Sequence, residues 1–361
     1  MTHQAPILPF FATYLRKINS VAICGLYVVV FLHITTTHLN YGKPVFMPYL
    51  CKIMHIRIGT RSSRLAVWQA EHIQSLLQEG GLTSELVLIE TKGDLVLDRS
   101  LAKIGSKGVF TQELEDQLRT GTIDIAVHSA KDLPSNLPSD LHIIAFTERE
   151  PANDVLVSRN KNLSLTGGEA FRIGTSSTRR VAMLKHYCPH ITTVDMRGNL
   201  QTRLRKLDEG QCDALLLAYA GVHRMGYDDL IVERLPLAEF TPAVAQGSIA
   251  VEVATSLNSE VSEAIVRLVN HDPTAACLRA ERAFLARLEG GCSIPSFALA
   301  QWTEENTISL TGGLVSLDGS ELIRDTFAGD PAESPLIGHS LAEAILARGG
   351  DVLLQDIRAH L

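Results

Sequence analysis

The sequence lacks the features that mark a metalloprotein, a disulfide-rich domain or a nucleotide-binding protein. Its cysteines form no CxxC pair and no paired spacing; they are Cys24, Cys51, Cys188, Cys212, Cys277 and Cys292. This scatter argues against a zinc site and against a disulfide framework, and it favours a reducing cytoplasm. No GxxxxGK[ST] loop is present and no GxGxxG pattern follows a predicted strand, so nucleotides are not indicated as ligands.

Excess positive charge is also missing. The formal net charge is -7 at pH 7, so the surface as a whole would repel nucleic acid and offers no general attraction to anionic membranes. The apolar run 21–34 contains a histidine and is shorter than the roughly 18 to 20 residues that a membrane helix needs. We therefore expect neither a nucleic-acid nor a membrane partner.

Residues 1–53 differ from the rest of the chain, and two interpretations are open. Arg16 and Lys17 precede the apolar run, which is typical of a signal-like anchor. Alternatively the start is assigned too far upstream, and Met54 opens the working protein, because MHIRIGT begins a strand at once. Under either interpretation we expect residues 1–53 to be dispensable for folding and activity.

From Met54 the pattern is strand, loop, helix and strand, repeated. HIRIGT (55–60) alternates as a short strand, and a helix follows over 65–78, with Leu65, Trp68, His72 and Leu76 along one face. A second helix over 111–121 has Thr111 as its cap and Gly121 as its stop, and the strand IDIAVHS comes next. This alternation predicts an α/β fold with a parallel sheet.

A second unit echoes the first. RIGTRSSRLAVWQ (57–69) is matched by RIGTSSTRRVAMLK (172–185), each a strand, a Gly-Thr turn, small hydroxyls and arginines, then a helix. We expect two similar α/β domains that face each other and a third, smaller domain. The boundaries that the pattern predicts are 1–53 for the extension, 54–147 plus 248–265 for domain 1, 153–241 for domain 2 and 270–361 for domain 3.

Arginines recur at the starts of these helices, where the positive end of the helix dipole disfavours them unless an anion is shared. They are Arg61 in the first unit, and Arg179, Arg180, Arg197 and Arg203 in the second. Free backbone N–H groups and the hydroxyls of Ser63, Thr175 and Ser177 complete good carboxylate or phosphate sites. The plain alternative for each arginine is a solvated surface role.

Two further positions stand out. Lys131 and Asp132 follow a buried strand, at the edge where open α/β sheets bind ligands; Asp132 could pass a proton there or could simply close a turn. Cys292 follows a helix over 274–288 and two glycines, which leave the thiol accessible for attachment or nucleophilic chemistry. An inert thiol is the alternative, and no base lies beside it in the sequence.

Taken together, these stretches resemble the porphobilinogen deaminase (hydroxymethylbilane synthase) family. The matching segments include RIGTRSSRLAVWQA, LAKIGSKGVF, DIAVHSAKDLP, IGTSSTRR, RGNLQTRL, AVAQG and RLEGGCSIP, in family order from Arg57 to Pro295. The resemblance implies two lobes of the type II periplasmic-binding-protein kind around a cleft, and a small α+β third domain that carries the cofactor cysteine. It also implies a monomeric cytoplasmic transferase of tetrapyrrole biosynthesis.

The resemblance assigns chemistry to the two outstanding positions. Cys292 would carry a dipyrromethane cofactor through a thioether bond, as an anchor and not as a nucleophile that turns over. Asp132 would hold pyrrole N–H groups and assist the loss of ammonia from porphobilinogen, and four rounds would give the linear hydroxymethylbilane. No metal is implied.

Further roles follow from the match, position by position. Beside Asp132, catalytic roles would fall to Lys103 and Gln246. The cofactor would be held by Cys292, Asp94, Ser129, Lys131, Asp132, Thr175, Ser177, Arg179, Arg180 and Arg203. The substrate and the growing chain would be held by Arg61, Ser63, Arg197, Arg203, Arg224 and Phe110.

Some residues depart from the family pattern, and one competing function remains. Ala245 replaces a usual glycine before Gln246, His223 replaces a usual lysine, and Arg64 stands where proline or another residue is frequent. The competitor is a two-lobed binding protein for an anionic small solute, which would explain the arginines but needs neither a third domain nor Cys292. The mass of two added pyrrole units on the purified chain would separate the two.

Overall fold

The computed structural model describes residues 21–24, 27–30, 55–91, 111–291 and 293–360. The chain divides into two compact units, Met1–Lys52 and Ile53–Leu361. The first unit contains strands β1 (Val21–Cys24) and β2 (Tyr27–Val30), which pair in antiparallel register. Over the described ranges, no helix has both the length and the apolar character needed to cross a membrane.

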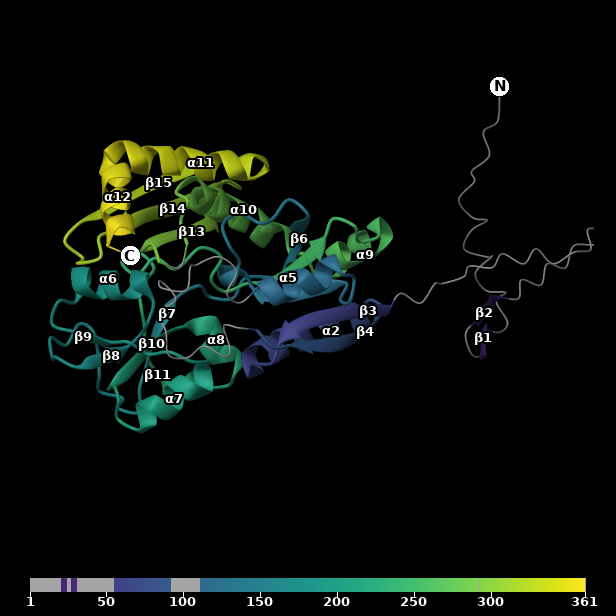
Figure 1. Ribbon diagram of the computed structural model, residues 1–361, viewed down its shortest axis with the longest axis horizontal. Coiled ribbons are helices and arrows are strands. Elements are labelled where there is room, and N and C mark those ends of the chain that lie inside the picture. Colours follow the sequence, from purple (N-terminus) through teal and green to yellow (C-terminus); the bar gives the residue numbers. More distant parts are fainter. Residues whose placement is uncertain (1–20, 25–26, 31–54, 92–110, 292, 361) are drawn as a thin grey trace, which may run out of the picture. The chain divides into compact units, whose positions relative to one another are not determined.

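The larger unit contains two five-stranded sheets and one three-stranded sheet (Figure 1). In the first, β3 lies parallel to β4 and β5, whereas β12 runs antiparallel to β5 and β6. Its order is β4-β3-β5-β12-β6, and its strands are β3 (His55–Arg61), β4 (Thr83–Ile89), β5 (Ile125–Ser129), β6 (Leu141–Phe146) and β12 (Ile249–Ala254). Strand β12 comes from far along the chain, so the chain returns to this sheet after the strands of the second sheet.

Three helices accompany this sheet: α2 (Arg64–Glu79), α5 (Gln112–Arg119) and α9 (Ser259–Val269). Helix α2 begins where predicted, because the Ser63 side chain accepts the Ala66 amide as an N-cap. Its core-facing residues are Ala70, Ile73 and Leu77, which pack with the strands. The face that sequence periodicity singled out, with Trp68 and His72, is only partly buried. On this face Trp68 and Leu76 pack against the edge of the same core, and the Trp68 and His72 rings stack on each other.

The second sheet repeats the plan of the first. Strand β8 is parallel to β9 and β10, and β7 is antiparallel to β10 and β11. The order is β11-β7-β10-β8-β9, with β7 (Asp154–Val157), β8 (Arg172–Gly174), β9 (Thr192–Val194), β10 (Ala214–Ala218) and β11 (Ile231–Arg234). Its helices are α6 (Thr178–Tyr187), α7 (Leu200–Asp208) and α8 (Tyr219–Arg224).

The echo between the two units extends to a matched ion pair. Arg57 Nη2 in β3 donates to Asp124 Oδ1 at 2.7 Å, and Arg172 Nη2 in β8 donates to Asp213 Oδ1 at 3.0 Å. In each case the arginine's own backbone amide also donates to the same aspartate, at 2.8 Å. Strands β3 and β8, which occupy equivalent places in the two five-stranded sheets, therefore each carry the same kind of arginine–aspartate pair.

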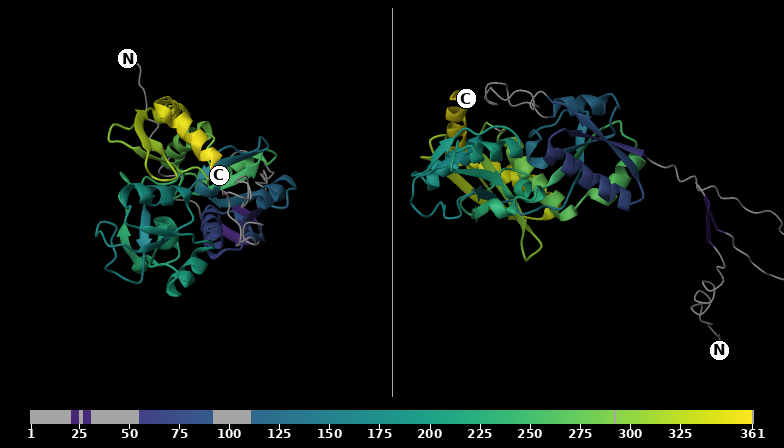
Figure 2. Two further views of the ribbon diagram at one scale, coloured as in Figure 1. Left: turned by 60° about the vertical axis from the view of Figure 1, so that its left-hand side comes forward. Right: turned by 90° about the horizontal axis from the view of Figure 1, so that it is seen from below.

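The third sheet is antiparallel and is covered by helices (Figures 1 and 2). It contains β13 (Ser296–Trp302), β14 (Ile308–Val315) and β15 (Leu322–Gly329), with α10 (Asp272–Arg287), α11 (Ser334–Ile345) and α12 (Asp351–Ala359). Phe284, Leu310, Leu314 and Leu341 are fully buried in its core. The three sheets confirm the predicted fold class of two α/β lobes and a small α+β part.

Candidate functional site

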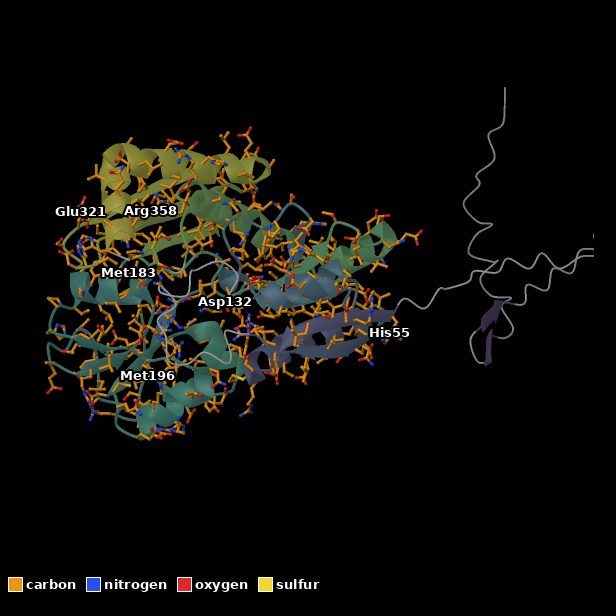
Figure 3. The ribbon with its side chains drawn as sticks, in the orientation of Figure 1. His55, Asp132, Met183, Met196, Glu321 and Arg358 are labelled. Carbon is orange, nitrogen blue, oxygen red and sulfur yellow. The ribbon has the colours of Figure 1, made fainter. Side chains whose placement is uncertain are left out.

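The end of strand β5 carries three of the predicted site residues. Ser129 closes the strand and accepts the Gln69 side-chain amide at 2.9 Å. Lys131 and Asp132 follow in a single 3-10 turn, Ala130–Asp132, whose first amide donates to the carbonyl of Ser248 at 3.0 Å. The turn is thus fixed to the neighbouring strand, and Asp132, which is labelled in Figure 3, is exposed.

A pocket beside this turn brings four predicted residues together. Among the described residues, its polar lining consists of Arg61, Ser63, Gln69, Thr111, His128, Ser129 and Asp132. Arg61 comes from the end of β3, Ser63 caps α2, and Ser129 and Asp132 come from the end of β5. The ends of parallel strands meet at one edge of a sheet, which is why residues far apart in the sequence share this pocket.

The second lobe supplies a pair of buried arginines at the start of α6. Arg179 and Arg180 are 4% and 6% exposed, and both donate to the carboxylate of Asp154, which is fully buried. Arg179 Nη2 lies 2.7 Å from Asp154 Oδ2, and Arg180 Nη2 lies 2.7 Å from Oδ1. Burial alone would raise the pKa of Asp154, but the charges of the two arginines outweigh it and hold that pKa well below its usual value.

Gln246 connects this pair to the turn on the first lobe. Its amide nitrogen donates to Asp154 Oδ1 at 2.9 Å and to the carbonyl of Ala152 at 2.8 Å. Because the nitrogen is committed to these acceptors, the amide oxygen is free to accept from Lys131 Nζ, at 3.3 Å. Two predicted site residues, Lys131 and Gln246, are therefore in direct contact.

The centre of the site holds more positive than negative charge. We call Lys131, Arg179, Arg180 and Arg203 the cation cluster. Burial, and next the charge of Arg180, lowers the pKa of Lys131 to about 8 and that of Arg203 to about 10. The negative charges that oppose these shifts come from Asp132 for both groups, from Asp154 for Lys131 and from Asp195 for Arg203, so four cations face three carboxylates. Such a cluster is suited to an anionic ligand.

Comparison with known proteins decides the family. Residues 56–262 match the family model "Porphobilinogen deaminase, dipyromethane cofactor binding domain", and residues 275–347 match "Porphobilinogen deaminase, C-terminal domain". The chain is 53% identical over 306 residues to the porphobilinogen deaminase of Cytophaga hutchinsonii, covering 85% of this chain and 98% of the relative. It is 44% identical over 310 residues to that of Moorella thermoacetica, covering 85% and 98%.

The chain belongs to the porphobilinogen deaminase family.

It is accordingly an enzyme, a transferase of tetrapyrrole biosynthesis, and dipyrromethane is its cofactor. Solved structures with a similar backbone include a Bordetella pertussis BvgS periplasmic VFT2 domain, with a TM-score of 0.36 and 15% identity over 59% of this chain and 86% of that one. Another is the Lactococcus lactis GlnP substrate binding domain 2, at 0.37 and 12% over 59% and 87%. These likenesses are too weak to carry an argument about this chain.

The described residues fit the cofactor of a porphobilinogen deaminase. Each pyrrole ring carries an acetate and a propionate, so dipyrromethane brings several carboxylates to a site with a surplus of cations. Arg179 Nε is buried and has no hydrogen-bond partner among the described residues, so a donor remains for a ligand. Cys292, the attachment point that fits this family, lies outside the described residues, as do Asp94, Lys103 and Phe110.

Arg224 has surroundings different from those of the cation cluster. Its Nε donates to Glu150 at 2.8 Å, its Nη2 donates to the carbonyl of Gly247 at 2.8 Å, and its guanidinium lies 5.5 Å from the centre of the Trp68 ring. Both acceptors belong to the segments that connect the two lobes. The predicted role of Arg224 in holding substrate stays a prediction, and so do those of Arg197 and Arg203, whose Nε atoms donate to Asp195 and Gly198.

The predicted hydroxyls at the start of α6 have clear local partners. Ser177 caps the helix by accepting the Arg180 amide, and Thr175 is buried with its hydroxyl 3.3 Å from the Ser177 amide. Sequence reasoning missed Asp154, the carboxylate that organises the arginine pair. The one available signal was an acidic residue that opens the apolar strand DVLV, where burial demands a cationic partner.

Proposed function

We propose that the cation cluster and Asp132 form the working centre at which this enzyme condenses four porphobilinogen molecules into hydroxymethylbilane with release of ammonia. One observation carries the proposal: the buried cations around Asp132 exceed the carboxylates that accompany them, and burial together with the charge of Arg180 lowers the pKa of Lys131 and of Arg203. A substrate whose every ring carries an acetate and a propionate would supply the missing negative charge.

The chain's own residues would divide the work between holding anions and moving a proton. When bound, dipyrromethane supplies the free pyrrole position at which the product chain grows. Lys131, Arg179, Arg180 and Arg203 would hold its carboxylates, with Ser129, Thr175 and Ser177 as hydroxyl donors. Arg61 and Ser63, which line the pocket beside Asp132, would hold the incoming substrate, with Arg197 and Arg224 as further candidates.

Asp132 would act on the reacting bond. At the rim of this pocket the exposed Asp132 side chain, in its protonated form, can deliver its proton to the amino group so that ammonia leaves, and the carboxylate that remains can accept the pyrrole N–H. The methylene carbon left on the substrate is cationic, and a fixed negative charge beside it lowers the energy of that charge. Gln246 would keep Lys131 in place through the 3.3 Å contact.

We further propose the setting in which this chemistry takes place. The domains would be 54–147 plus 248–265, 153–241 and 270–361, each built on one of the three sheets. One chain contributes Asp132, the arginine pair and Lys131, which supports a monomer as the working form. Cys188, Cys212 and Cys277 are free, buried thiols, which suits the cytoplasm.

Mass spectrometry tests the proposal. The intact mass of the purified chain should exceed the mass of the sequence by two pyrrole units, and the excess should vanish in Cys292→Ser. The loaded chain should release ammonia from porphobilinogen, and size-exclusion chromatography with light scattering should give the mass of one chain. A bare chain that binds porphobilinogen without releasing ammonia would instead support a solute-binding protein.

A further inference from the structure

Asp154 has no part in the chemistry proposed above, yet its carboxylate accepts hydrogen bonds from three other side chains. Its side chain is fully buried at the first position of β7. It accepts hydrogen bonds from Arg179, from both Nε and Nη2 of Arg180, and from Gln246, at distances of 2.7 to 3.1 Å. A fully buried carboxylate with this many donors is a fixed centre for the groups around it.

The arginines need such a centre because of where they lie. Both occupy the first turn of α6, whose backbone N–H groups carry partial positive charge, and their guanidinium groups share one acceptor side chain. Two adjacent cations in a buried place repel each other and avoid the helix start. Asp154 reverses this, because one carboxylate accepts from both groups and draws them to the same point.

Hydrogen-bond accounting shows what the pair has left for a ligand. A guanidinium has five N–H donors in a planar fork. Arg180 uses donors on Nε and Nη2 for Asp154, and one on Nη1 for the carbonyl of Leu216 at 3.0 Å. Arg179 uses Nη2 for Asp154 and Nη1 for the carbonyl of Thr241 at 3.0 Å and the Met183 sulfur at 3.5 Å, while its Nε has no partner in the described part of the chain. Both forks are thus fixed in plane and direction while some donors stay available.

We propose that Asp154 is a positioning residue for cofactor assembly: an internal carboxylate that aligns the two arginine forks so that their remaining donors meet the carboxylates of dipyrromethane. This inference rests on the proposed function, in which Arg179 and Arg180 hold the cofactor. Through Gln246, which donates to Asp154 and accepts from Lys131, the same carboxylate also orients the lysine on the other lobe.

Asp154→Asn tests this proposal, because its effect on charge favours cofactor loading whereas its effect on arginine alignment opposes it. The amide removes a negative charge from the cluster, which by itself strengthens the attraction for an anionic cofactor. It also replaces one shared acceptor oxygen by an N–H₂ group that faces a guanidinium. In a folded chain, a fall in loading is therefore opposite to the effect of the charge change and is the result expected from lost alignment.

We expect the fraction of folded chains that carry the added mass of two pyrrole units to fall about tenfold, the change expected for loss of one charge-assisted contact. Asp213→Asn is the matched control, since it breaks an aspartate–arginine pair of the same lobe at a half-exposed position away from the cluster. Loading of Asp154→Asn equal to that of the wild-type chain would overturn the proposal.

A second measurement separates alignment from general loss of structure. In a Cys292→Ser background, which keeps the cofactor out, phenylglyoxal should modify Arg179 and Arg180 several-fold faster after Asp154→Asn, as read by peptide mass mapping. The modification rate of Arg172 should stay unchanged between the two proteins, and circular dichroism should confirm the fold. Unchanged rates at Arg179 and Arg180 would count against Asp154 as the residue that fixes them.

The comparison is repeated with one arginine removed, in case Asp154→Asn alone does not fold. Arg179→Met removes one of the two charges that Asp154 balances, so the double variant Arg179→Met, Asp154→Asn should be folded. The proposal requires it to load less cofactor than Arg179→Met alone, because Arg180 loses its anchor; equal loading overturns it. Absence of the added mass from the wild-type chain would contradict the proposed function itself, and is therefore distinguishable.

Discussion

Lys131 and Asp132 are neighbours on one turn but stand in different surroundings. Asp132 is exposed at the rim of the pocket, whereas Lys131 is partly buried against Gln246 and near the arginine pair. The exposed Asp132 carboxylate can reach a substrate, whereas the partly buried Lys131 ammonium can pair with an anionic group of a ligand. At the scale of single residues, Asp132 is therefore placed for proton transfer and Lys131 for balancing the charge of a ligand.

Asp132→Asn should separate binding from chemistry. The amide keeps the size of the side chain and one acceptor oxygen, so the protein should fold and retain cofactor. It cannot carry the proton or the negative charge, so turnover should fall by a factor of at least about 100. Single-turnover ammonia release from porphobilinogen, with cofactor content matched to wild type, measures this. Release at a near wild-type rate would reduce Asp132 to a turn residue.

Lys131→Met should stabilise the cofactor-free protein. The pKa of Lys131 is about 8 in the folded chain against 10.5 ordinarily, because burial and Arg180 disfavour its charged form. Below pH 8 the folded protein therefore bears the cost of a charged Lys131. In a Cys292→Ser background, methionine should raise the free energy of unfolding by about 1 to 3 kcal/mol at pH 7.

The sign of that effect can be checked by its pH dependence. The gain should be fully present below pH 8 and should fade as pH rises toward 10.5, because Lys131 then loses its proton in the folded state first and afterwards in the unfolded state as well. Urea unfolding at several pH values measures this. The exposed Lys185→Met is the control and should shift stability by less than about 0.5 kcal/mol. A destabilised Lys131→Met at pH 7 would contradict the assignment.

At the scale of elements, the connecting segment before β12 decides how the lobes meet. Ala245 has φ +61° and Gly247 has φ +106°, both in the left-handed region. The Ala245 amide donates to Glu281 at 2.7 Å, and the Gly247 backbone lies against Glu150, where an added Cβ would come within 2.5 Å of a carbonyl oxygen. Ala245, the departure from the family's usual glycine, is thus held in a conformation that glycine adopts without strain.

The two positions should respond oppositely to exchange. Ala245→Gly should raise the free energy of unfolding by up to about 1 kcal/mol, since relief of left-handed strain exceeds the added entropy of the unfolded chain. Gly247→Ala should lower it by about 2 kcal/mol or more, because it adds left-handed strain and a backbone clash. Chemical unfolding of both variants gives the comparison. If Ala245→Gly lowered the free energy of unfolding and Gly247→Ala raised it, the segment would have another conformation in solution.

At the scale of the whole molecule, Glu281 joins the third sheet's helix α10 to both lobe connections. It is fully buried, and it accepts from Arg149 Nη2 at 3.2 Å, from the Ala245 amide and from the Ala300 amide at 2.8 Å. Arg149 in turn donates to the carbonyl of Gln246 at 2.8 Å. One carboxylate therefore fixes the cofactor-bearing part of the chain against the segment that holds Gln246.

Glu281→Gln should destabilise the folded protein strongly. The amide leaves the Arg149 guanidinium buried without its counter-charge, and breaking a buried ion pair from one side costs about 3 to 5 kcal/mol. Glu343→Gln, which breaks an exposed pair with Arg287 in the same part of the chain, should cost less than about 1 kcal/mol. Urea unfolding of the two variants measures the difference. Similarly small losses of unfolding free energy in both variants would show that Glu281 does not fix helix α10 against the connecting segments.

The sequence by itself determined the family, the fold class and the repeat of the two lobes. Local patterns suffice for this, because a strand, a Gly-Thr turn and a capped helix are written within about 15 contiguous residues. The start of α2, predicted at residue 65 and found at Arg64, and the turn that carries Asp132 are local in this sense.

Only the tertiary structure decided what the site residues contact. Helical periodicity placed Trp68 and His72 on one face of α2, but only the structure shows that their rings stack on each other and that Trp68 packs at the edge of the core. Nor could periodicity reveal that Asp154 pairs with Arg179, or that Glu281 holds Ala245. Such partners are separated by tens of residues and meet only when the sheets form, since a buried charge specifies that it needs a partner but not which one.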